Sequence, residues 1–330
     1  MAYETGAATG VVDLVNKFAT FIEANGWTRD DLSNEGTGRR YHAHRGLQFV
    51  NMRGYVNESP GANFDSTANT GVYSIAFNIG TGYSGATPWY NQAGVPIGTS
   101  TKYGCSGMTL VSGAITAYHF FAQGGGDVIY AVVERTSGIY TYIGFGLVTK
   151  YGTWTGGDFM FGGQSGVTNS TSAGKGFFGV FSFSNLEGQT KGYVKVDVDG
   201  ETGWHWGTGG DAFSNRDTTK RYIGDTLASL VFSAGMEPNT HNGLTTVQPV
   251  QIIVERTASH LSTGVQSLIG EIPFTGLFNI GESIVPSQQI TFGTDNYRVF
   301  PFFAKNSSAV GSTAFASTTH SMRLGWAIKE

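Results

Sequence analysis

The sequence predicts a mainly β protein of antiparallel sheets, arranged as a sandwich or a barrel, with one amphipathic helix near the N-terminus. Only residues 10–25 repeat their apolar positions with a clear helical spacing. Most later apolar runs instead alternate with a period of two, and short segments containing Gly, Asn or Asp separate them. Because such segments form the tight turns that join neighbouring strands, antiparallel pairing is expected.

The helix is predicted over residues 10–25. Its apolar residues recur at steps of three and four, which places them on one stripe: Val11, Leu14, Val15, Phe18, Phe21 and Ile22. Asn25-Gly26 marks its end, because Gly readily adopts the left-handed conformation that stops a helix. Either the body of the protein or a neighbouring subunit can cover the stripe. We therefore treat it as a candidate assembly helix.

Beyond Trp27 the pattern is typical of strands. Residues 47–56 and 72–79 alternate apolar and polar side chains. Residues 81–102 are rich in Gly, Pro and Tyr, which predicts a long ordered loop. Residues 115–149 contain β-branched and aromatic runs separated by Gly-containing turns, and we expect a three-stranded meander there.

The C-terminal part is expected to continue in strands. Asp199-Gly200 lies between two alternating runs and predicts a hairpin that begins near Tyr193. Further short apolar runs predict strands near residues 250–255, 288–293, 297–304 and 323–328.

We divide the chain into three regions. Residues 1–36 form an N-terminal helical region, and residues 37–175 form a β-rich region that contains the meander at 115–149. Residues 176–330 form a further β-rich region. The last two regions either fold separately or continue one another, and the sequence leaves both arrangements open.

The composition is poor in charge and rich in aromatic residues. The 330 residues include 49 Gly, 6 Trp, 15 Tyr and 23 Phe, against 20 Lys and Arg and 24 Asp and Glu. Charged residues make up 13% of the chain, whereas an ordinary soluble domain has about 25%. Aromatic enrichment and charge depletion are typical of the cores of protein interfaces. The composition therefore predicts a component of an assembly, most simply a symmetric homo-oligomer.

Other bulk properties exclude several classes of function. A net charge of −4 without a long basic run argues against direct nucleic-acid binding. The single Cys105 excludes a framework of intrachain disulfides. No uncharged apolar stretch reaches the ~18 residues of a membrane helix, so no membrane segment is expected.

Three motifs have both a functional and a structural interpretation. Residues 80–85 match G-x-G-x-x-G, but Pro88 follows where a dinucleotide site needs a helix, so a loop is favoured. Asp197, Asp199 and Glu201 suggest calcium, although their spacing fits a hairpin better than a calcium loop. His42 and His44 would share one side of a strand and could hold a metal in an oligomer. Nearby arginines favour a polar surface there, and no metal or other cofactor is expected.

Catalytic signatures are weak. Asp158 lies near aromatic residues, as the carboxylates of glycosidases do, but the sequence does not reveal a partner carboxylate. We therefore expect that the protein is not an enzyme. Trp204 and Trp206 are two positions apart, so in a strand they would share a face and could form a stacking platform for a glycan. Packing in a core or an interface is the alternative for this pair.

Several stretches resemble structural virion proteins of tailed bacteriophages. The opening helix is followed by ANGWT at 24–28, and the central block contains YHFF, YTYIGFG and WTGGDF at 118–121, 140–146 and 154–159. The C-terminal part contains IGEIP, GTDNYRVFP and LGWAIK at 269–273, 293–301 and 324–329. These stretches cover about a third of the chain and carry no catalytic signature.

The resemblance implies a structural component of the neck or collar, the tail or the baseplate. Its partners would be other copies of itself and other virion proteins. It would be assembled in the host cytoplasm and reside in the virion. The alternative function is a tail protein that binds a host-surface receptor or glycan, for which Trp204 and Trp206 are the candidate site.

Overall fold

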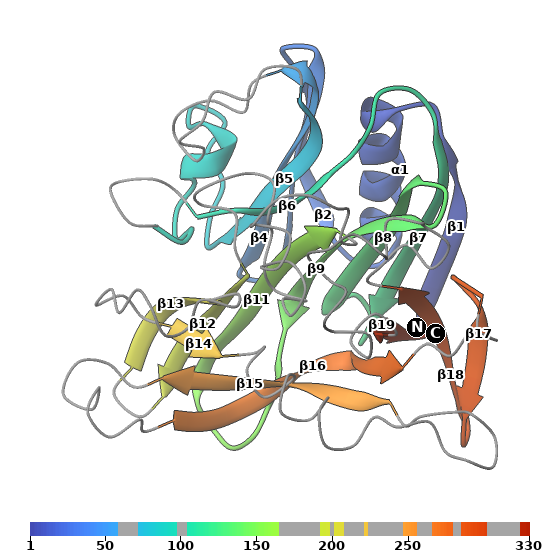
Figure 1. Cartoon of the computed structure of the whole chain (residues 1–330). Coiled ribbons are helices and arrows are strands. Elements are labelled where there is room, and N and C mark those ends of the chain that lie inside the picture. Colours follow the sequence, from blue (N-terminus) through green and yellow to red (C-terminus); the bar gives the residue numbers. More distant parts are fainter. Residues whose placement is uncertain are drawn as a thin grey trace, which may run out of the picture.

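The computed structural model describes residues 1–58, 72–97, 104–164, 192–198, 201–207, 221–223, 247–255, 266–279, 285–301 and 324–330. Within this part the chain is mainly β, with one α-helix near the N-terminus, as predicted (Figure 1). The elements are β1 (Ala2–Ala8), α1 (Val11–Ala24), β2 (Thr28–Glu35), β3 (Gly38–Arg45), β4 (Gln48–Glu58), β5 (Val72–Gly80), the 3-10 turn η1 (Trp89–Asn91), β6 (Ser106–Thr109), β7 (Ile115–Gln123), β8 (Val128–Thr136), β9 (Ile139–Leu147), β10 (Thr149–Lys150), β11 (Thr155–Gln164), β12 (Tyr193–Val198), β13 (Glu201–Gly207), β14 (Arg221–Ile223), β15 (Gln248–Glu255), β16 (Gln266–Asn279), β17 (Gln289–Phe292), β18 (Asp295–Pro301) and β19 (Leu324–Lys329).

The strands form two sheets. A 14-stranded sheet has the order β1-β7-β8-β9-β11-β12-β13-β14-β15-β16-β19-β18-β17, and β10 pairs with β16 beside this path. A five-stranded sheet has the order β2-β3-β4-β5-β6. The pairs are antiparallel apart from β13 and β14. The antiparallel pairing β7-β8-β9 confirms the predicted meander, and that of β12 with β13 confirms the predicted hairpin.

The 14-stranded sheet folds back on itself. Aromatic and aliphatic side chains of β7, β8, β9, β11 and β12 form one core with those of β15, β16, β18 and β19. In this core the ring of Tyr130 lies 5.3 Å from that of Trp326, edge to face. The hydroxyl of Tyr130 donates a hydrogen bond of 2.6 Å to the carbonyl of Pro273. The two halves of the sheet therefore pack as a sandwich.

The five-stranded sheet and helix α1 cover the other face of the meander. A second core combines the apolar side of α1 with side chains of β3, β4, β5, β7, β8 and β9. The ring of Phe18 lies 4.9 Å from that of Phe120. Gly54 of β4 allows the helix to approach closely, since a Cβ there would lie 2.9 Å from Val15 Cγ2. In Figure 1, α1 stands beside β7 and β8.

Helix α1 begins and ends as the sequence predicts. The Asp13 carboxylate accepts a hydrogen bond from the backbone N–H of Thr9, 2.8 Å away, and so lies near the positive end of the helix. Gly26 has φ +89° after the last turn. None of the six stripe residues is more than 4% exposed. The assignment of this stripe as an assembly helix is therefore corrected: the body of the chain buries it, which leaves no apolar helix face for a second subunit.

The predicted regions share one sheet. Strand β1 comes from residues 1–36, β7 to β11 from residues 37–175, and β12 to β19 from residues 176–330, and all of them join the 14-stranded sheet. Residues 81–97 belong to the long ordered loop expected over 81–102, whose remaining residues lie outside the described part. Among the described residues, no helix has the length and apolar character needed to cross a bilayer.

The two ends of the chain meet beside the meander (Figure 1). The Tyr3 hydroxyl lies 2.8 Å from His119 Nδ1 at hydrogen-bond distance. The Arg298 guanidinium lies 4.6 Å from the centre of the Tyr3 ring and pairs with Glu330. Burial, together with the charge of Arg298, lowers the pKa of His119 to about 4.

Replacing Phe18 by Asp is expected to destabilise the protein strongly. The substitution places an unpaired carboxylate in a core position, which should lower the free energy of unfolding by about 3 kcal/mol or more. Urea denaturation followed by tryptophan fluorescence measures this change. Lys17→Ala, on the exposed side of α1, is the matched control and should change stability by about 0.5 kcal/mol or less. Equal tolerance of both substitutions would contradict burial of the stripe.

The buried His119 should make stability depend on pH. Unfolded histidine takes up a proton near pH 6.5, whereas folded His119 does so only near pH 4, so the unfolded state binds more protons between these values. Stability should fall as the pH drops through this window, by up to about 3 kcal/mol. Comparing urea denaturation of the wild type and His119→Phe at pH 7 and pH 4.5 isolates this contribution. If the free energy of unfolding falls between pH 7 and pH 4.5 by the same amount in the variant as in the wild type, His119 does not make this contribution.

Candidate functional site

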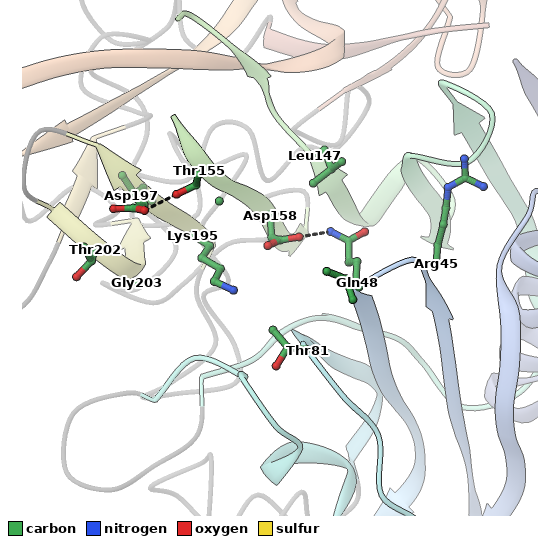
Figure 2. A pocket seen from close by; sticks show the side chains of 13 residues that line it. Arg45, Gln48, Thr81, Leu147, Thr155, Asp158, Lys195, Asp197, Thr202 and Gly203 are labelled. Atoms are coloured by element: carbon green, nitrogen blue, oxygen red, sulfur yellow. Dashed lines mark hydrogen bonds between the residues drawn. The ribbon is translucent and has the colours of Figure 1, made fainter. Parts of the chain in front are cut away.

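An open cleft of about 660 Å³ lies where the five-stranded sheet meets the 14-stranded sheet (Figure 2). One wall comes from the β3–β4 turn and from Thr81, which follows β5. The opposite wall comes from the end of β9 and from β11, β12 and β13. The cleft therefore combines residues from both sheets and from distant parts of the sequence.

The β3–β4 turn contributes an apolar side chain to the lining of the cleft. Arg45 and Gln48 pair across the turn, so Gly46 and Leu47 are its two central residues. Gly46 has φ +58°, which suits the first position of a two-residue hairpin turn. Leu47 is consequently held at the tip with 87% of its surface exposed. Leu147, 43% exposed, lines the cleft from the end of β9.

A bulge in β11 positions Asp158 for contact with the smaller sheet. The register of β11 against β12 shifts between Gly156 and Phe159, and Gly156 and Gly157 have φ values of +86° and +101°. Such bulges redirect side chains at the margins of sheets. Asp158 thereby reaches Gln48, whose Nε2 donates to Asp158 Oδ1 at 2.7 Å and to the Gly146 carbonyl at 3.2 Å.

The cleft contains a balanced set of charges. Asp158 and Asp197 contribute carboxylates, and Thr155 Oγ1 donates a hydrogen bond to Asp197 Oδ2. Arg45 contributes a guanidinium that pairs with Asp127 at 3.0 Å. Lys195 extends its ammonium group from β12 (Figure 2), and it has no ion pair within the described residues. Among the described residues that line the cleft, the two cations Arg45 and Lys195 therefore balance the two carboxylates Asp158 and Asp197.

The structure brings together two acidic residues that the sequence singled out separately. Asp158, considered as a catalytic carboxylate, and Asp197, considered as a calcium ligand, line the same cleft. Asp199 and the side chain of Glu201 lie outside the described residues. In the described part of the chain, no three acidic, His or Cys side chains gather closely enough to hold a metal ion.

Trp204, the described half of the predicted glycan platform, lies beside the cleft lining. The Trp204 indole is half-buried, and its Nε1 donates to the Gly94 carbonyl at 2.8 Å. Its ring lies 6.5 Å from that of Tyr193, edge to face. The backbone of Trp206 pairs with Tyr193, and its side chain lies outside the described residues. Trp204 thus packs against the loop at residues 81–97.

The histidine pair has partners within the smaller sheet. His42 is buried, with Nδ1 2.8 Å from Asn51 Oδ1. His44 lies 2.9 Å from Asp30. Both histidines belong to β3, as the extended interpretation of this segment required. Residues 80–85 leave β5 for a loop and begin no helix, which confirms the structural interpretation of that motif.

The sequence did not indicate Gln48, Lys195, Leu47 or Leu147 as site residues. The available signals were the Gly46 turn, which predicts an exposed tip, and the Gly156-Gly157 pair, which predicts a bulge before Asp158. Neither signal shows that the two segments meet, because that depends on how the sheets pack.

The hydrogen bond between Gln48 and Asp158 should couple the two sheets energetically. A double-mutant cycle with Gln48→Ala and Asp158→Ala is expected to give a coupling energy of about 1–2 kcal/mol, since one partner is charged and the other is buried. Urea denaturation of the four proteins measures it. The exposed pair of Arg29 and Glu23, which joins β2 to α1 and not the two sheets, is the control, for which about 0.5 kcal/mol is expected. A coupling between Gln48 and Asp158 no larger than this control would show that the bond does not link the sheets.

Comparison with known protein families and with curated protein sequences found no match. Function must therefore be inferred from the residues and their geometry. The relevant features are the mixed cleft between the sheets, the exposed apolar side chains and the low overall charge.

Proposed function

We propose that the protein is a structural component of a tailed-bacteriophage particle, in the neck or collar, the tail or the baseplate, and that it assembles as a symmetric homo-oligomer. The resemblance noted in the sequence supports the particle. The composition supports assembly, because aromatic-rich and charge-poor chains are typical of proteins that bury surface against partners. A structural role requires no catalytic group, and we propose none.

The observation that best supports assembly is the exposure of large aliphatic side chains. Ile97 and Val285, neither of which lines the cleft, are 73% and 64% exposed. The stripe of α1 is already covered within the chain, so contacts between copies must use other surfaces such as these. Burying apolar side chains of this size stabilises an association by about 1.5–3 kcal/mol each when burial is complete.

Association should be visible in solution. The purified protein is expected to form a species several times larger than the 35.2 kDa chain in light scattering. Replacing Ile97 and Val285 together by Ser should shift the population toward monomer. Ser137→Ala, at another exposed position, is the control and should leave the mass unchanged. A monodisperse monomer of the wild type at high concentration would contradict the proposal.

A second candidate role is attachment to a host-surface glycan. The observation that favours it is the cleft between the sheets, which offers polar and apolar groups together (Figure 2). This role is compatible with a structural position in the particle, because a tail protein can serve both.

A further inference from the structure

On the basis of the attachment role considered above, we propose that the cleft between the β3–β4 turn and strands β11, β12 and β13 binds a neutral carbohydrate. Trp204 is not among the described residues that line this cleft. It is defined by Leu47 and Leu147, by the carboxylates of Asp158 and Asp197, and by the ammonium group of Lys195.

The apolar part of the cleft suits the C–H faces of a sugar ring. Leu47 and Leu147 come from different sheets and line the same cleft, each with much of its surface in water. Large aliphatic side chains in a concave site gain free energy when a ligand removes them from water. A pyranose ring offers apolar C–H groups of this kind together with hydroxyls.

The polar part of the cleft suits hydroxyl groups. The Asp158 and Asp197 carboxylates each have one oxygen in a hydrogen bond from a neighbouring side chain, and an ionised carboxylate has about four acceptor positions. The remaining positions can accept hydrogen bonds from sugar hydroxyls. The Lys195 ammonium group has three donors, and Thr81 supplies a further hydroxyl. A sugar hydroxyl both donates and accepts, so it can use both kinds of group.

The charge balance argues for a neutral ligand. Two carboxylates in the cleft disfavour phosphate groups and nucleic acids, which need an excess of cations. Lys195 and Arg45 similarly disfavour a polyamine, because like charges in a partly desolvated site repel. A divalent cation would need more ligands than the two described carboxylates supply.

The site is held in shape before a ligand arrives. Gln48 fixes the Asp158 carboxylate from across the cleft, and Thr155 fixes that of Asp197 (Figure 2). The Gly46 turn and the β11 bulge fix the backbone that carries Leu47 and Asp158. Groups positioned in this way lose little conformational entropy on binding, which favours affinity for a small ligand.

Titration of the purified protein with maltotriose, cellotriose, chitotriose and mannotriose, followed by saturation-transfer NMR and calorimetry, tests the proposal. At least one of these neutral trisaccharides is expected to bind, with a dissociation constant of about 1 mM or lower. Lys195→Met and Asp197→Asn, which keep the size of the side chain, should each weaken that binding about tenfold or more. Lys17→Met, on the exposed side of α1, is the matched control and should leave it unchanged.

Three results would overturn the proposal. They are the absence of binding by all four trisaccharides at about 10 mM, equal binding by the wild type and both cleft variants, and preferential binding of a heparin oligosaccharide or spermidine. Light scattering of the same samples measures the oligomeric state, so the structural role is tested independently of sugar binding. Asp197→Asn should form the same oligomer as the wild type while binding the sugar more weakly. A wild-type protein that binds the sugar but forms no oligomer would contradict the structural role and leave the carbohydrate site supported.

Discussion

The meander β7-β8-β9 has apolar side chains on both faces, and this property constrains the rest of the fold. One face presents Phe120, Ile129 and Phe145 to helix α1 and the five-stranded sheet. The other presents Phe121, Tyr130 and Tyr142 to the returning half of the 14-stranded sheet. A sheet that is apolar on both faces must be covered twice, because each uncovered apolar face would lose about 25 cal/mol per Å² of burial. The layered arrangement follows from this requirement.

The candidate cleft is a consequence of the same layering. The five-stranded sheet reaches the larger sheet through α1 and the core beneath it, and the β3–β4 turn meets β11 at the margin of that core. At this margin the apolar contacts give way to the hydrogen bond between Gln48 and Asp158. Leu47 and Leu147 remain exposed there. A mixed apolar and polar surface is therefore available at the junction of the sheets.

Local patterns predicted the helix and several of the strands, but not β1 or β16. The helix predicted over residues 10–25 is Val11–Ala24, and the meander and the β12–β13 hairpin have the predicted pairing. These features depend on side-chain spacing and turn residues within a few positions. The sequence did not predict which surface packs on the α1 stripe, because an apolar stripe does not show whether its own chain or another subunit buries it. The site was not predictable either: Gln48 and Asp158 are 110 positions apart, and only the packing of the sheets brings them together.

Amide hydrogen exchange at different protein concentrations tests most directly whether α1 belongs to the core of its own chain. If it does, the amides of α1 and those of β7 to β9 should open with the same high free energy, as a single cooperative unit. That protection should be independent of concentration, including dilutions at which the oligomer dissociates. Rapid exchange of the α1 amides in the dilute protein, with protection appearing only on association, would show that another subunit covers the helix and would contradict the account.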